Sequence, residues 1–182
     1  MKATRLALQE IVLLEPKAYD DERGAFYESF NARTFADLTG AQVPFVQDNH
    51  SISRRGVLRG LHYQLPPAPQ GKLVRVVHGA VFDVAVDIRR SSPTFGRWVA
   101  EILSAENRRQ LWIPPGFAHG FLALREGTEV LYKTTDFYHR AAERAVRWDD
   151  PDIAIAWPTE SSPILSAKDA AAPVLASAET FD

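Results

Sequence analysis

The sequence predicts an all-β fold, either a sandwich or a barrel of short strands. Residues 81–88 alternate between two faces, one of them formed by Phe82, Val84, Val86 and Ile88, and this period of two is typical of a half-buried strand. Further short strand candidates follow at regular spacing, with turn-forming residues between them. Few segments have the spacing of a helix. These patterns together favour a core built from sheets.

Six strands are expected in the central part of the chain, at residues 73–77, 81–88, 97–103, 109–113, 119–124 and 129–135. The turn between the first two contains His78 and Gly79. The later turns are rich in serine, proline and glycine, and they lie at residues 91–93, 114–116 and 126–127.

Helices are expected at only two places. Asn31 is a suitable N-cap for a short helix over residues 31–38, and Gly40 follows its end. Residues 166–169 have the pattern of a helix start. The alanine-rich tail, residues 170–182, is expected to be helical or frayed.

Length and composition indicate one domain over residues 1–182, with 46% apolar and 24% charged residues. The chain has no cysteine, which excludes disulfides, thiolate chemistry and cysteine-based metal sites. The net charge is −2 and basic residues are scattered, so nucleic-acid binding is not expected. No apolar run approaches the ~20 residues of a membrane span, and residues 1–10 do not resemble a secretory signal. A cytoplasmic protein without membrane contact is therefore expected.

Two of the five histidines have informative neighbours. His62 follows Gly60, which marks a place where a backbone or a ligand approaches closely if the segment is a strand. His119 follows a Pro-Pro-Gly turn of the kind that closes a barrel corner. The spacing of Gly56 and His62, and of Pro-x-Gly-x-x-His ending at His119, resembles the two halves of the cupin signature. This resemblance implies a cupin-like double-stranded β-helix, a jelly-roll barrel, with a few short helices.

The metal ligands of that signature are incomplete here. Metal-binding cupins continue with a second His two residues later and then a nearby Glu, whereas this chain has Gln64 and no Glu before Glu101. Two imidazoles without a third ligand make a poor site for a divalent metal. We therefore expect no metal and no other cofactor. An imidazole that holds no metal is available as a general base.

One task for a metal-free base is to remove a proton from a carbon beside a ketone, which makes an enolate. Imidazole is a weak base for this task, so the enolate oxygen needs a positively charged or hydrogen-bonding partner. Lys72 is a candidate for that partner, and its alternative is a solvated lysine at a strand edge. Inversion of a carbon also needs an acid on the opposite face. Tyr132 is the candidate acid, with a packed core tyrosine as its alternative.

Several motifs, taken in their order along the chain, resemble those of the dTDP-4-dehydrorhamnose 3,5-epimerase family. The resemblance extends from about residue 8 to residue 173. It rests on the segments Asp21–Phe26, Gln47–Ser51, Arg59–Gln64, Gln70–Lys72, Pro114–Gly120, Tyr132–Lys133 with Tyr138, Trp148–Pro151 and Ser166–Asp169.

The resemblance implies a reaction and roles for the catalytic residues. The substrate would be dTDP-4-keto-6-deoxyglucose and the product dTDP-4-keto-rhamnose, on the route to dTDP-rhamnose. His62 would remove the C3 and C5 protons, and Asp169 would orient it; on spacing alone Asp169 is equally well a capping residue. Tyr132 would reprotonate the other face, Lys72 would stabilise the enolate, and His119 would line the pocket.

The resemblance also implies binding residues and a partner subunit. Arg23, Arg59 and Lys168 would contact the diphosphate, and Tyr138 would stack on the thymine. Further contacts would come from Phe26, Glu28, Gln47, Asn49 and Glu143. The family forms homodimers that exchange N-terminal strands, so Arg23 and Glu28 are expected to serve the neighbour's site.

Other functions remain open at this stage. The nearest are a related cupin that inverts only one carbon, or a ketoisomerase; Tyr132 favours inversion, because only inversion needs a donor on the opposite face. A barrel that binds a nucleotide sugar without catalysis has no use for a His62–Asp169 pair. A metal-dependent cupin is disfavoured by Gln64.

Overall fold

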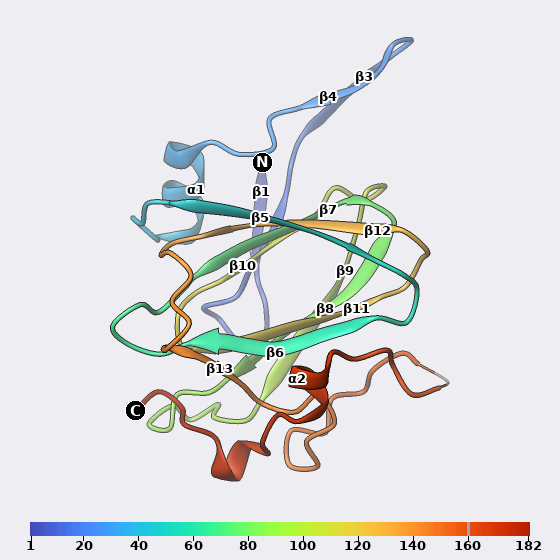
Figure 1. Ribbon diagram of the computed structural model, residues 1–182. Helices are drawn as coiled ribbons and strands as arrows, with labels where there is room; N and C mark the ends of the chain where they lie inside the picture. The colour runs from blue at the N-terminus through green and yellow to red at the C-terminus, as the bar shows by residue number, and fades with distance from the viewer. Residues whose placement is uncertain (160) are drawn as a thin grey trace.

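The computed structural model describes residues 1–159 and 161–182. Two sheets face each other and form the jelly-roll barrel expected from the sequence (Figure 1). The first sheet has six strands in the order β1 (Lys2–Arg5), β2 (Val12–Glu15), β10 (Gln110–Ile113), β7 (Lys72–His78), β12 (Thr128–Thr134), β5 (Gln47–Ser53). The second has five in the order β13 (Glu143–Ala145), β6 (Leu58–Gln64), β11 (Phe117–Ala123), β8 (Ala80–Asp87), β9 (Trp98–Ser104).

The six strands expected in the centre of the chain are all present, as β7 to β12, within one or two residues of their predicted bounds. The interpretation of β8 as half-buried was wrong, because both of its faces are covered. Val81 and Ala85 face the core between the sheets, whereas Val84 and Val86 pack against the C-terminal segment. The alternating residues of this strand therefore face two different buried environments, the core between the sheets and the packing against the C-terminal segment.

The helices also match their sequence signals. In α1 (Ala32–Thr39) the side chain of Asn31 accepts hydrogen bonds from the backbone of Arg33 and Thr34, and Gly40 adopts the left-handed conformation at the C-cap. The second helix, α2 (Ala167–Ala170), lies beside β6 (Figure 1). No helix among the described residues is long and apolar enough to cross a membrane.

The C-terminal tail differs from its prediction, since it is neither a continuous helix nor frayed. After α2 it contains one 3₁₀ turn, η1 (Leu175–Ser177). Leu175 and Ala178 are buried against the outer face of the five-stranded sheet, and Phe181 pairs with Arg89. Apolar burial, rather than helix propensity, orders this segment.

The third sheet is a hairpin of β3 (Ala18–Asp21) and β4 (Gly24–Tyr27), and it extends away from the barrel (Figure 1). Tyr19 and Phe26 are directly opposite each other in its register and are 59% and 75% exposed. A two-stranded hairpin with exposed aromatic rings is marginal by itself in water.

Strands β6 and β11 meet at the point where each carries its histidine. His62 and His119 are direct partners in the antiparallel register. Gly60 has a φ of +131°, and a Cβ there would lie 2.5 Å from the Cα of Gly120. Only glycine allows this close approach, as the sequence indicated for Gly60.

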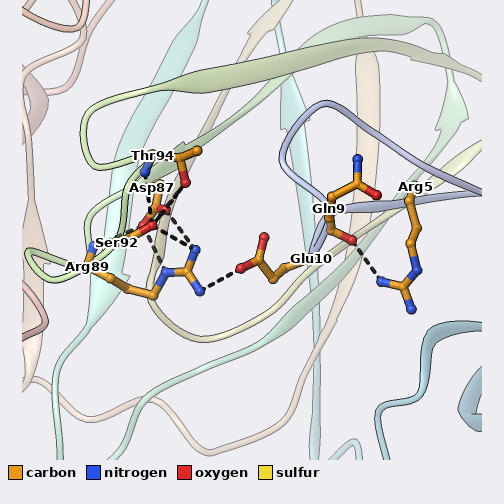
Figure 2. Close-up of polar contacts among 7 residues, drawn as sticks. All are labelled: Arg5, Gln9, Glu10, Asp87, Arg89, Ser92 and Thr94. Carbon is orange, nitrogen blue, oxygen red and sulfur yellow. Dashed lines mark hydrogen bonds and ion pairs between the residues drawn. The ribbon is translucent and has the colours of Figure 1, made fainter.

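Asp87, at the end of β8, organises the turn that follows (Figure 2). Its buried carboxylate accepts hydrogen bonds from Arg89, Ser92 and Thr94. Arg89 also pairs with Glu10 at 2.9 Å and lies over the ring of Phe117 at the start of β11. Burial, which raises the pKa of Asp87, is outweighed by these hydrogen bonds, and the pKa falls to about 2. In the same view the backbone oxygen of Gln9 accepts from Arg5 at 2.7 Å.

We predict that Asp87→Asn lowers the unfolding free energy at pH 7 by roughly 2 kcal/mol, or roughly 4–8 °C in Tm, because bonds from charged donors to a buried carboxylate are weakened. Since the folded pKa is depressed, this stabilisation is present above about pH 4 and is lost as the pH falls towards 2. Thermal unfolding of both proteins across this range should show the difference narrowing at low pH. The same change at the exposed Asp37 of α1 serves as control, and equal effects at both positions would contradict the role of Asp87.

Candidate functional site

A cavity of about 230 Å³ lies between the two sheets. It is lined by Ser51, Arg59, His62, Lys72, His119, Phe121, Tyr132, Ser166, Lys168 and Asp169. A second cavity of about 140 Å³ shares His62, Lys72 and Tyr132 with the first. Its lining adds Gln47, Asn49, Tyr63, Gln64, Gln70, Tyr138 and Glu143. The structure thus brings together all the residues proposed from the sequence except three.

His62, which is half-buried, pairs with the buried Asp169 at the edge of this site. The imidazole Nε2 lies 2.5 Å from Oδ1 of Asp169, whose side chain is only 5% exposed. Asp169 is placed by α2, where its backbone N–H donates to the Ser166 side chain. Burial raises the pKa of Asp169, but the contacts with His62, Ser166 and Lys168 together outweigh it and the net shift is downward. A charged carboxylate therefore fixes the ring and leaves its other nitrogen free.

A second pair, between His119 and Asp83, was missed by the sequence analysis as a functional element. Both carboxylate oxygens of Asp83 lie within 3.1 Å of Nε2 of His119, and Asp83 is completely buried. Burial lowers the pKa of His119, although the charge of Asp83 opposes the shift. The sequence pattern that could have identified Asp83 is its alternation with Val81 and Ala85 on one face of β8. A carboxylate on a buried face needs a partner.

Lys72 is not a solvated lysine at a strand edge. Its side chain is buried, and Nζ donates to the backbone oxygen of His62 at 3.0 Å. Burial lowers its pKa to about 8, while the charges of Asp83 and Glu143 act in the opposite direction. Lys72 therefore remains largely protonated at neutral pH and places a positive charge beside His62.

Tyr132 comes from β12, in the sheet opposite the one that carries His62 and His119. Its ring packs against the core between the sheets, and the residue also lines both cavities. Burial raises the pKa of its hydroxyl, so the phenol is protonated at neutral pH. The Tyr132 side chain thus both packs in the core and lines the cavity, two roles that were alternatives in the sequence analysis.

Polar residues around the cavities form a connected network. Glu143 of β13 accepts from the Tyr138 hydroxyl at 2.9 Å and also pairs with Lys168. Burial raises the pKa of Glu143, but these two contacts outweigh it and lower the pKa. Arg59 donates to the Ser53 hydroxyl at 3.1 Å, which holds its guanidinium at the cavity edge.

The three residues outside the site are Arg23, Phe26 and Glu28. The first two lie on the β3–β4 hairpin and the third follows it, and none lines either cavity. Arg23 is paired with Asp21 and is largely exposed. In one copy of the chain, this hairpin therefore contributes nothing to the site.

Gln64 stands where metal-binding cupins have a second histidine. Its side-chain amide forms hydrogen bonds with backbone groups. Its amide nitrogen donates to the oxygen of Ala68 at 2.7 Å, and its oxygen accepts from the N–H of His139 at 2.8 Å. Within residues 1–159 and 161–182, no three His, Asp or Glu side chains converge as a metal site requires.

Comparisons with known proteins agree with this geometry. A family model described as dTDP-4-dehydrorhamnose 3,5-epimerase matches residues 5–177. The enzyme of that name from Pseudomonas aeruginosa is 59% identical over 181 residues, covering 100% of this chain and 99% of the relative.

Solved structures show the same fold. The 3,5-epimerase from Legionella pneumophila, in complex with dTDP-4-keto-L-rhamnose, has a TM-score of 0.94 and 53% identity over 97% of this chain and 93% of that one. A 3′-monoepimerase from Streptomyces bikiniensis, in complex with dTDP-quinovose, has a TM-score of 0.88 and 38% identity over 94% and 86% of the two chains. The chain belongs to the dTDP-4-dehydrorhamnose 3,5-epimerase family.

Proposed function

We propose that this isomerase inverts C3 and C5 of dTDP-4-keto-6-deoxyglucose to give dTDP-4-keto-rhamnose, with His62 as base and Tyr132 as acid. The observation that carries the proposal is the His62–Asp169 pair facing Tyr132 across a cavity between two sheets. Relatives named for this reaction, at up to 59% identity among those compared, support it.

The first step is removal of a proton next to the C4 ketone. The imidazole nitrogen of His62 that is not bonded to Asp169 takes the proton, and the electron pair moves into an enolate with its charge on the C4 oxygen. Asp169 stabilises the imidazolium that results. The Lys72 ammonium, held beside His62, stabilises the enolate oxygen in a buried setting where such an interaction is strong.

The second step returns a proton to the same carbon from the opposite face. Tyr132 donates it, since its hydroxyl is protonated at neutral pH and comes from the opposite sheet. His62 then releases its proton to water and Tyr132 regains one from water, and the same cycle at the other carbon completes the double inversion. No step requires a metal or another cofactor.

The nucleotide half of the substrate is bound by the network around the cavities. Arg59 and Lys168 contact the diphosphate, for which the planar arginine side chain is well suited. Tyr138, 55% exposed at the second cavity, stacks on the thymine. Gln47, Asn49, His119 and Glu143 make further polar contacts with the nucleotide sugar.

Inversion of a single carbon is the closest alternative, because the 3′-monoepimerase shares the fold and many residues. Higher identity to the 3,5-epimerases favours double inversion. A non-catalytic barrel is disfavoured because it has no need for two His–Asp pairs at one cavity. The cytoplasmic location expected from the sequence stays a prediction.

The functional unit in this proposal is a homodimer in which the β3–β4 hairpin reaches the neighbour's site. The exposed pair of Tyr19 and Phe26 supports this, because such rings are stabilised by contact with a partner. Arg23, Phe26 and Glu28 would then complete the substrate site from the other subunit. Ile52, 66% exposed on the outer face of β5, provides further apolar surface.

For His62→Ala we predict loss of solvent deuterium incorporation at both C3 and C5, by at least about 10²- to 10⁴-fold, because a positioned general base contributes that much. Incubation of dTDP-4-keto-6-deoxyglucose in deuterated water, followed by NMR, measures the exchange at each carbon. His78→Ala, which removes an exposed imidazole elsewhere, is the control. Near-normal exchange by a folded His62→Ala variant would place the base elsewhere.

For Tyr132→Phe we predict deuterium exchange without inversion. His62 can still remove a proton and return a deuteron to the same face, while the opposite face has no donor. The ring and its packing are preserved, so the fold should be unchanged. NMR of the sugar distinguishes exchanged substrate from inverted product, and inversion near the wild-type rate would rule out Tyr132 as the acid.

The exchanged hairpin is tested by mixing two inactive variants. Arg23→Ala homodimers should bind substrate poorly, and His62→Ala homodimers should lack the base. In a co-expressed mixture, a heterodimer would have one site with both residues intact, so activity should recover to roughly a quarter of the wild-type level. No recovery above the two separate variants would show that Arg23 serves its own subunit, and normal activity of Arg23→Ala homodimers would show that it has no role.

A further inference from the structure

The inward face of β5 is polar along its whole length. Gln47, Asn49, Ser51 and Ser53 point toward the barrel interior, while the residues between them are exposed. Inward positions of a barrel strand are normally apolar, because they fill the core. An unbroken row of polar side chains there suggests that the strand faces a polar ligand rather than other core residues.

Three of these four side chains have partners within the protein. The amide of Gln47 donates to Asn49 at 2.9 Å, and its oxygen accepts from the backbone N–H of Tyr138. Ser53 accepts from Arg59. These contacts hold residues to which the proposed function already gives a role in nucleotide binding.

Ser51 is the exception. Its hydroxyl oxygen is buried and has no hydrogen-bond partner among the described residues. A buried hydroxyl without a partner is unfavourable, and alanine at this position would avoid the problem. A polar group that lowers stability without making a contact often has a functional reason.

The position of Ser51 indicates that reason. It lines the cavity that holds His62, Lys72 and Tyr132, but not the second cavity with Tyr138. In the register of β5 and β12, Ser51 is opposite Val130 and one diagonal step from Tyr132 on the same face. Ser51 therefore lies beside Tyr132, at the wall of the cavity in which the proposed function places the sugar.

We propose that Ser51 is a substrate-binding residue whose hydroxyl hydrogen-bonds an oxygen of the sugar ring close to Tyr132. The assignment rests on the proposed function, because it requires a nucleotide sugar in this cavity. In the complex this bond pairs a hydroxyl that has no partner among the described residues, and it fixes the ring against the face that Tyr132 protonates.

The test compares binding of dTDP and dTDP-glucose to wild type and Ser51→Ala by calorimetry. dTDP-glucose lacks the ketone and is not epimerised, so its affinity is measured at equilibrium. We expect Ser51→Ala to weaken dTDP-glucose about 2- to 12-fold, the effect of one hydrogen bond, and to leave dTDP unchanged. The Tm of the free variant should stay constant or rise by roughly 2–4 °C, since an unpaired hydroxyl has been removed.

Ser104→Ala is the matched control. Ser104 is also a buried strand serine, but its hydroxyl accepts from the N–H of Asn107 at 3.0 Å. That variant should lose thermal stability and bind both ligands normally. Unchanged dTDP-glucose affinity in Ser51→Ala, or equal weakening of both ligands, would overturn a contact with the sugar. If wild type bound neither ligand, the proposed function itself would fail, and the assignment of Ser51 with it.

Discussion

The hydrogen bond between His62 and Asp169 joins the C-terminal segment to the barrel, and several other features depend on it. A four-residue helix such as α2 is not stable alone. It is held by the Ser166 cap, by the pair of Lys168 with Glu143, and by the tail that follows. The burial of Leu175 against the outer face of the five-stranded sheet anchors that tail. Apolar packing on one side of the sheet thus positions a carboxylate at the mouth of the barrel.

The interior of the barrel contains more ionisable groups than a simple core tolerates. His62, Lys72 and His119 lie close together, and Asp83 and Asp169 each pair with one of the two imidazoles. Burying charges is costly unless each has a partner, so the carboxylates are required by the presence of the bases. Lys72, with a pKa of about 8, stays largely charged beside His62, the base of the proposed mechanism.

The extent to which the sequence predicted this site depends on how local each signal is. His62 and His119 were found because their turns and glycines are close in the chain, and Gly60 indicated the close approach to Gly120. Asp83 and His119 are 36 residues apart in the chain, and their pairing depends on the register of β8 and β11. No local sequence pattern predicts that register. Asp83 appeared as one polar position in an alternating strand.

The ends of the chain were predicted less well for a related reason. Strands β1 and β2 are only four residues long, and their strand character comes from pairing with each other and with β10. The tail is rich in alanine, which favours helix, yet burial of a few apolar residues on the sheet decides its path. Asn31 and Gly40, by contrast, act within one turn of α1, and their prediction was confirmed.

The division of the proposed site between two sheets suits it to the inversion of a carbon. A metal site needs ligands that converge on one point, and residues from one sheet can provide them. Inversion needs a base and an acid on opposite faces of a flat enolate, so the two groups must be separated by the thickness of a sugar ring. In the proposed mechanism the base is His62 and the acid is Tyr132, and these residues belong to different sheets on either side of the cavity. The layered architecture thus matches this requirement of the proposed chemistry, and Gln64 bonds to the backbone of Ala68 and His139.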